Sequence, residues 1–171
     1  ESTYGYDVEA SEIRASLLRS PIFCFHDPER PRPGVRYQYV DQGQHDYRIW
    51  LLLHAGGWRA AQTARLAREL VNIPVVLPEP AHEGSLPPRS SFIEIGPENV
   101  NGVVLKQCEH AFEDTIVRFY ETTGEPTRAW VRSAFLDWEW EGELGPCEIK
   151  TLRINPAGQV WETNLLEEIE E

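Results

Sequence analysis

The sequence predicts a mainly β fold of the sandwich type with one α-helix. Beyond residue 90, apolar and polar residues alternate in short runs, separated by Gly, Pro or Asn turns at intervals of about 8–12 residues. Helical spacing is convincing in one segment, residues 59–72, where Ala60, Ala64, Ala67 and Val71 recur on one face. The strands predicted in the second half cover residues 91–95, 100–108, 115–121, 128–135, 147–154 and 160–165.

The first half predicts fewer strands. Residues 12–19 alternate between apolar and polar side chains until Ser20-Pro21, where proline removes a backbone donor. A stronger alternation covers residues 44–54, and its second face becomes apolar along the strand, which is typical of a strand that enters a core between two sheets. Shorter strands are predicted at residues 35–39 and 75–77.

A loop rich in Pro, Glu, Ser and Gly at residues 78–89 is the best predicted boundary between two domains. We therefore expect residues 1–90 to be part of a larger β-sandwich that carries the helix at 59–72. Residues 91–171 are expected to form a small immunoglobulin-like β-sandwich. The Pro-rich residues 27–34 predict an exposed, stiff loop.

Composition excludes several classes of partner. The 171 residues include 28 acidic and 16 basic residues, a net charge of −12, which disfavours binding to nucleic acid. The longest apolar stretch, residues 49–53, is too short to cross a bilayer. Cys24, Cys108 and Cys147 are widely spaced, which favours buried, reduced thiols over a disulfide. Because the chain contains no Met, we expect it to be a fragment of a longer polypeptide.

Two polar clusters invite a catalytic or metal interpretation. Residues 41–46, with His26 and Asp27 nearby, carry ligand types that suit zinc, but a turn built by Asp and Gly explains them better. Glu139 and Glu141 could form the carboxyl pair that glycoside hydrolysis requires. Since they alternate with Trp138 and Trp140, a solvated acidic face opposite a buried Trp face is the favoured interpretation.

Other chemistry lacks support in the residues. No Ser stands in a GxSxG context, and Ala55-Gly56-Gly57 before the helix lacks the Lys and the spacing of a phosphate-binding loop. Exposed Trp side chains could stack on sugar rings, although packing in the core is favoured for each of them. The candidates for such stacking are Trp130, Trp138, Trp140 and Trp161.

Several short motifs follow one another along the chain. The first three are YGYD at residues 4–7, LLRSP at 17–21 and DQGQH at 41–45. HAGGW at 54–58 and LVNIP at 70–74 follow. The next motif is a pair of segments, residues 103–106 and IVRFYE at 116–121. The last motif is EIKTL at 148–152. In this order, these motifs resemble the C-terminal region of glycoside hydrolase family 38 α-mannosidases, closest to the cytosolic and bacterial branch. The gap between Pro21 and Asp41 is longer than the family pattern.

The resemblance implies a retaining α-mannosidase whose nucleophile and zinc or cobalt site belong to an upstream catalytic domain of the same polypeptide. It implies that residues 1–90 are part of a galactose-mutarotase-like supersandwich. It implies no catalytic residue, metal ligand or cofactor in this chain, which alone is expected to be inactive. The expected role is that of a scaffold and substrate-pocket wall for an α-mannoside, in the cytoplasm, with homo-oligomers possible and with no nucleic-acid or membrane partner.

Arg19, Asp41 and His45 are the residues that the resemblance places at the wall of the mannoside pocket. A guanidinium group could donate to sugar hydroxyls or pair with a carboxylate, and Asp41 and His45 could do either. The alternative is an internal network that fixes the turn between two strands. The alternative function for the whole chain is a free-standing carbohydrate-binding or oligomerisation module.

Overall fold

The computed structural model describes residues 5–22 and 32–169. The chain divides into two compact units, Glu1–Leu51 and Leu52–Glu171. The boundary predicted near residue 90 stays a prediction, although the helix falls in the second unit together with the sandwich. Tyr4, Cys24, His26, Asp27 and most of the Pro-rich loop lie outside the described residues.

The first unit contains a β-hairpin. Strand β1 (Tyr6–Glu9) pairs antiparallel with β2 (Glu12–Ala15), and Ala10 and Ser11 at the turn have positive φ. All residues of both strands are exposed. The strand predicted over residues 12–19 is therefore confirmed only in its first four residues, and neither of its faces is buried.

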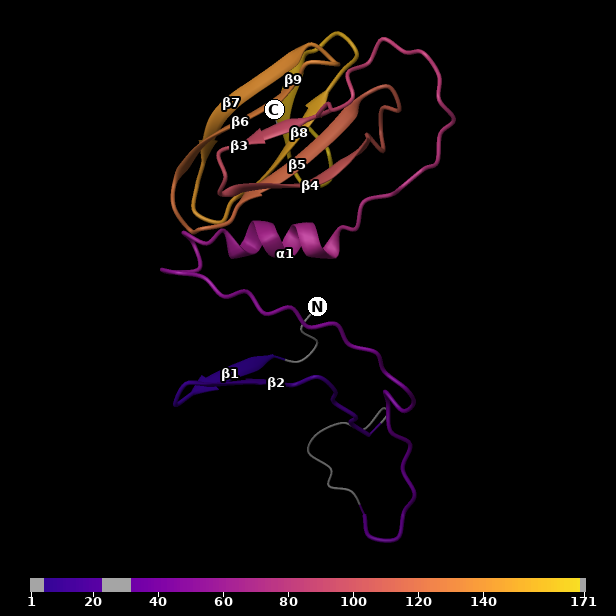
Figure 1. Cartoon of the computed structure of the whole chain (residues 1–171), viewed down its shortest axis with the longest axis vertical. Helices are drawn as coiled ribbons and strands as arrows, with labels where there is room; N and C mark the ends of the chain where they lie inside the picture. The colour runs from indigo at the N-terminus through magenta and orange to yellow at the C-terminus, as the bar shows by residue number, and fades with distance from the viewer. Residues whose placement is uncertain (1–4, 23–31, 170–171) are drawn as a thin grey trace. The chain divides into compact units, whose positions relative to one another are not determined.

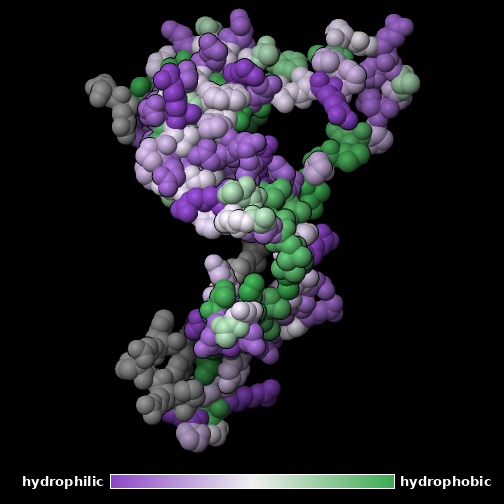
Figure 2. All heavy atoms as spheres, turned by 60° about the vertical axis from the view of Figure 1, so that its left-hand side comes forward, coloured by the Kyte–Doolittle hydropathy of each residue, from purple (hydrophilic) through white to green (hydrophobic). Residues whose placement is uncertain are grey.

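The strong strand predicted over residues 44–54 is wrong in this structure, as are the shorter strands at 35–39 and 75–77. Leu51, Leu53 and Val75 each keep 78–85% of their surface exposed. A strand needs a neighbour for its backbone hydrogen bonds, and among the described residues of these three segments only Tyr39 pairs, in an isolated bridge with Ile22. Figure 2 shows the resulting runs of hydrophobic residues along extended stretches of the chain outside the sandwich.

Helix α1 (Thr63–Val71) confirms the predicted helix, which is shorter than residues 59–72. It begins after Gln62, which has a left-handed backbone conformation and provides no side-chain cap. It ends at Asn72, whose backbone N–H and side-chain amide both donate to the carbonyl of Arg68, at 3.0 and 2.7 Å. Pro74 follows, so the helix cannot continue.

The second unit contains an antiparallel β-sandwich (Figure 1). One sheet has the strand order β3-β6-β7 and the other the order β4-β5-β8-β9. This confirms the mainly β, sandwich-type fold with one helix, and the predicted strands from residue 91 onward all occur, some with shifted ends. The bounds are β3 (Glu94–Gly96), β4 (Val100–Gln107), β5 (Thr115–Glu121), β6 (Thr127–Ser133), β7 (Trp138–Leu144), β8 (Ile149–Ile154) and β9 (Val160–Thr163).

The core lies between the two sheets and follows the alternation of the strands. In β5 and β6 the inward positions include Val117, Phe119, Ala129 and Val131, all at most 1% exposed. Trp138 of β7 completes the core, and Trp140 is half-buried against it. Since Glu139 and Glu141 are exposed, the predicted buried Trp face and solvated acidic face are confirmed.

Cysteine burial was predicted correctly in one of the two described cases. Cys108 is buried, whereas Cys147 is exposed, and both thiols are free. Cys147 is exposed because it lies in the turn between β7 and β8 with positive φ. Within residues 5–22 and 32–169, no helix has the length and apolar character needed to cross a membrane.

Helix α1 is attached to the sandwich through arginine side chains. Strand β4 is an edge strand with a register shift between Gly102 and Val104. Arg68 donates from Nε to the carbonyl of Gly102 (3.1 Å) and from Nη2 to the carbonyl of Val103 (2.9 Å). Because an edge strand leaves carbonyls without a strand partner, Arg68 satisfies them and ties the helix to this edge.

We expect Arg68→Ala to loosen helix α1 without unfolding the sandwich, because a nine-residue helix depends on tertiary contacts. Loss of about 1 kcal/mol should speed amide hydrogen exchange in residues 63–71 about fivefold. Arg65→Ala is the matched control, since Arg65 pairs with Glu69 inside the helix. Equal exchange in both variants would contradict the attachment.

A second close contact involves Gly142 of β7. A Cβ atom at this position would overlap the ring of Trp140, which is held by a hydrogen bond from Nε1 to Glu162 (3.2 Å) and by packing against Phe119. The ring cannot retreat without giving up these contacts. Gly142 is therefore required by the packing of Trp140.

Gly142→Ala should lower the free energy of unfolding by about 1–3 kcal/mol, as overpacking does. Gly57→Ala should change it by less than about 0.5 kcal/mol, because a Cβ there meets nothing within 4 Å. Urea denaturation followed by fluorescence measures both. A Gly142→Ala chain as stable as the parent sequence would show that the Trp140 ring moves freely.

Candidate functional site

The three residues predicted at a pocket wall are only partly brought together. His45 Nε2 lies 2.9 Å from the main-chain oxygen of Asp41, which has positive φ, so these two residues share a turn. His45 also stacks with Tyr47, with ring centroids 6.2 Å apart. Arg19 is exposed, and within residues 5–22 and 32–169 no hydrogen bond or ion pair joins it to Asp41 or His45. Their role at a substrate pocket stays a prediction.

The other sequence candidates for chemistry have structural roles. Glu141 pairs with Arg128 at 2.6 Å on the exposed face of the sheet, and the hydrogen bond from Arg128 lowers the pKa of Glu141. Among the described residues, no group of three or more His, Cys, Asp or Glu side chains could hold a metal ion. His26 and Asp27 lie outside them.

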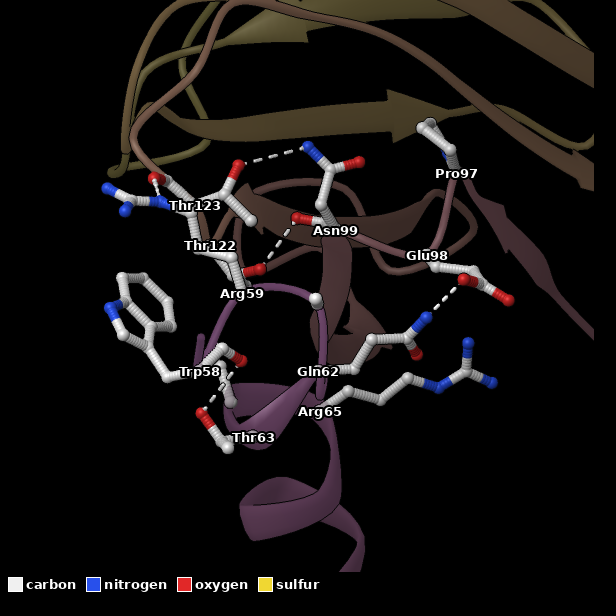
Figure 3. Close-up of a pocket in the computed structure, with 12 residues that line it drawn as sticks. Trp58, Arg59, Gln62, Thr63, Arg65, Pro97, Glu98, Asn99, Thr122 and Thr123 are labelled. Atoms are coloured by element: carbon white, nitrogen blue, oxygen red, sulfur yellow. Dashed lines mark hydrogen bonds between the residues drawn. The ribbon is translucent and has the colours of Figure 1, made fainter. Parts of the chain in front are cut away.

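A cavity of about 550 Å³ lies between the start of the helical segment and two turns of the sandwich (Figure 3). Arg59 donates from Nε to the carbonyl of Thr123 (2.6 Å), and Gln62 donates to the carboxylate of Glu98. These contacts hold residues 58–65 against the turns at 97–99 and 122–123. Trp58 keeps 45% of its surface exposed, and the Arg59 guanidinium lies 4.6 Å from its ring centroid.

Beneath this cavity a buried carboxylate organises the turns. Glu121, at the end of β5, is 1% exposed. Its Oε1 accepts from the side chain of Asn99 (3.0 Å) and from the backbone and hydroxyl of Thr123. Its Oε2 accepts from the backbone N–H groups of Gly124 (2.6 Å), Glu125 (3.3 Å) and Cys147 (3.1 Å). Glu121 therefore joins three separate turns of the sandwich.

The hydrogen bonds decide the charge of Glu121. Burial by itself would raise the pKa of this carboxyl, but the donors from Thr123, Cys147 and Asn99 outweigh burial and lower the pKa to about 2. Glu121 is therefore ionised at neutral pH and has its oxygens occupied. It cannot serve as a general acid, and its role is to fix the turns that line the cavity.

The cavity combines polar and aromatic side chains. Its polar side chains include the planar groups of Arg59, Gln62, Arg65 and Glu98, beside one indole ring. Sequence reasoning did not find it, because its walls come from segments far apart in the chain. A signal for Glu121 did exist, since strand alternation places it on the same face as Val117 and Phe119.

Glu121→Gln should lower the free energy of unfolding by about 3 kcal/mol at pH 7, because an amide cannot accept all these bonds and part of the network is left unpaired. Glu139→Gln, on the exposed face, should change it by less than about 0.5 kcal/mol.

The pH dependence of the Glu121→Gln effect has a definite sign. With the pKa lowered from 4.5 to about 2, the stabilisation by ionised Glu121 is complete above about pH 4.5 and is lost as the pH falls towards 2. The difference in denaturation midpoint between the parent sequence and Glu121→Gln should therefore shrink below pH 4.5. A difference that does not change with pH would contradict the assigned ionisation.

Comparison with known proteins connects this sandwich to one family. Residues 99–171 match the family model described as the glycosyl hydrolases family 38 C-terminal beta sandwich domain. The match begins at Asn99, which donates to Glu121, and it includes β4 to β9. No curated protein and no solved structure matches the chain. The part of the chain from residue 99 to residue 171 is therefore similar to the C-terminal beta sandwich domain of glycosyl hydrolase family 38.

Proposed function

We propose that this chain is the C-terminal part of a retaining α-mannosidase that hydrolyses terminal α-D-mannosides, and that it serves as scaffold and substrate-pocket wall. The family match over residues 99–171 carries this proposal. The catalytic domain, in the same polypeptide, would supply the nucleophile and the second carboxyl group of a retaining glycosidase. We place the complete enzyme in the cytoplasm, and the isolated chain is expected to be inactive.

The described residues support a non-catalytic role. Glu121 is the most buried carboxylate near the cavity, but its six hydrogen bonds leave it no capacity to protonate a leaving group. No described cluster fits a divalent metal, so the zinc or cobalt of the proposed enzyme is assigned to the catalytic domain and to none of these residues.

Exposed apolar residues support attachment to a larger body. Ile49, Leu51 and Leu53 alternate along an extended segment and are 71–85% exposed. Apolar surface of this kind gains free energy when it is covered, at about 25 cal/mol per Å². The preceding part of the proposed enzyme is the natural cover, because an added strand would also satisfy the backbone of this segment.

The test is hydrolysis of an aryl α-mannoside by the full-length polypeptide and by the 171-residue chain, each with added zinc or cobalt. We expect activity in the full-length polypeptide alone. Arg19→Ala in that polypeptide should lower kcat/KM at least about tenfold, with the melting temperature unchanged. Arg14→Ala is the control, since Arg14 is an exposed hairpin residue that pairs with Glu9 at 2.9 Å.

Three outcomes would overturn parts of this proposal. Hydrolysis by the 171-residue chain would place a complete catalytic site within it. A full-length polypeptide that cleaves other glycosides and leaves α-mannosides intact would exclude the proposed substrate. An Arg19→Ala enzyme with unchanged kcat/KM would remove Arg19 from the pocket wall.

A further inference from the structure

The cavity beside the helix has spare hydrogen-bonding capacity. Arg59 and Arg65 each use Nε within the protein, towards Thr123 and Glu69, and Gln62 uses its Nε2 towards Glu98. Several polar atoms of the cavity make no hydrogen bond with another described residue. They are the Nη groups of both arginines, the carbonyl oxygen of Gln62 and the second oxygen of Glu98. Planar groups of this kind match pairs of hydroxyl groups, since they offer two polar atoms in one plane.

The charges of the cavity argue against an anionic ligand. Arg65 forms an ion pair with Glu69 at 3.2 Å, and the negative charge of Glu98 lies in the same lining as the positive charge of Arg59. The ionised Glu121 adds a negative charge beneath the turn at 122–123. In a chain of net charge −12, this arrangement favours a neutral polar ligand over a phosphate or a carboxylate.

Trp58 adds an apolar surface to this polar lining. The Arg59 guanidinium covers one face of the indole ring, and the residue is still 45% exposed. In Figure 3 the indole lies on one side of the cavity, whereas Gln62, Arg65 and Glu98 lie on the other. A ligand that reaches both must present an apolar face and several hydroxyl groups along an extended molecule.

The walls are held in place before any ligand arrives. Thr122 donates from its backbone N–H and its hydroxyl to the carbonyl of Asn99, both at 2.9 Å. Asn99 in turn donates to Glu121 (3.0 Å) and Thr127 (2.7 Å). Because this network fixes the turns on one side of the cavity, binding there costs little ordering of the backbone.

We propose that this cavity is an accessory binding site for a short neutral oligosaccharide, in which one sugar ring stacks on Trp58 beside Arg59 and the next donates to and accepts from Gln62, Arg65 and Glu98. It requires only unit Leu52–Glu171, so it goes beyond the proposed scaffold role and does not depend on which glycoside the full-length polypeptide cleaves.

The test is a titration of the ¹⁵N-labelled 171-residue chain with mannobiose, cellobiose and inorganic phosphate, followed by amide and indole chemical shifts. We expect at least one disaccharide to shift the signals of Trp58, Gln62 and Thr123 with a Kd of about 1 mM. Phosphate should leave these signals unchanged at the same concentration.

Variants locate the site. Trp58→Ala should raise the Kd at least about tenfold, and Trp58→Phe should retain part of the binding. Trp50→Ala is the matched control, because Trp50 is 52% exposed and lies outside the cavity. The amide shifts of Thr123 report binding in every variant, including those that lack the indole.

The results separate this site from the proposed function. No shift with either disaccharide at 20 Kd, about 20 mM, would overturn it. Binding that survives Trp58→Ala, or phosphate binding to the same residues, would overturn it as well. Hydrolysis of α-mannosides by the full-length polypeptide is measured separately, and its result does not depend on whether this cavity binds a disaccharide.

Discussion

The buried carboxylate of Glu121 is the interaction on which the arrangement of the sandwich turns depends. It draws together the end of β5, the turn at residues 123–125 and the turn that contains Cys147. Glu148 reinforces the last of these by accepting from the backbone of Gly145 at 2.6 Å. A buried charge is costly unless it is fully hydrogen-bonded, so the backbone donors and the carboxylate stabilise one another only in this geometry.

How far the sequence predicts the fold depends on whether a segment finds its partner within the chain. Strand β5 was predicted with the same bounds that it has, because its alternation is matched by neighbours on both sides. Residues 44–54 alternate at least as clearly, yet they form no strand and stay exposed. Alternation of apolar and polar residues indicates which side chains are suited to burial. Strand pairing also requires a second strand, and the described residues provide none for residues 44–54.

The candidate site was less predictable for a different reason. Its parts, residues 58–65, 97–99 and 122–123, meet only when the helical segment lies against the turns. The contacts that place it there are donations from arginine to backbone carbonyls, which leave no periodic signal in the sequence. Arg19, Asp41 and His45 came from a resemblance, and the structure joins only the last two, through a main-chain carbonyl.

Helix α1 is attached to the sandwich on one side and exposes apolar residues elsewhere. Its link to the sandwich is made by Arg68, whereas its apolar residues Leu66, Leu70 and Val71 remain 37–57% exposed. A helix of nine residues is too short to be stable through its own hydrogen bonds, so it depends on what it contacts. One side is attached to the edge of β4, and the other presents apolar surface that burial would stabilise further. This two-sided character favours burial of the exposed side of the helix, and the same attachment shapes the cavity beside Trp58.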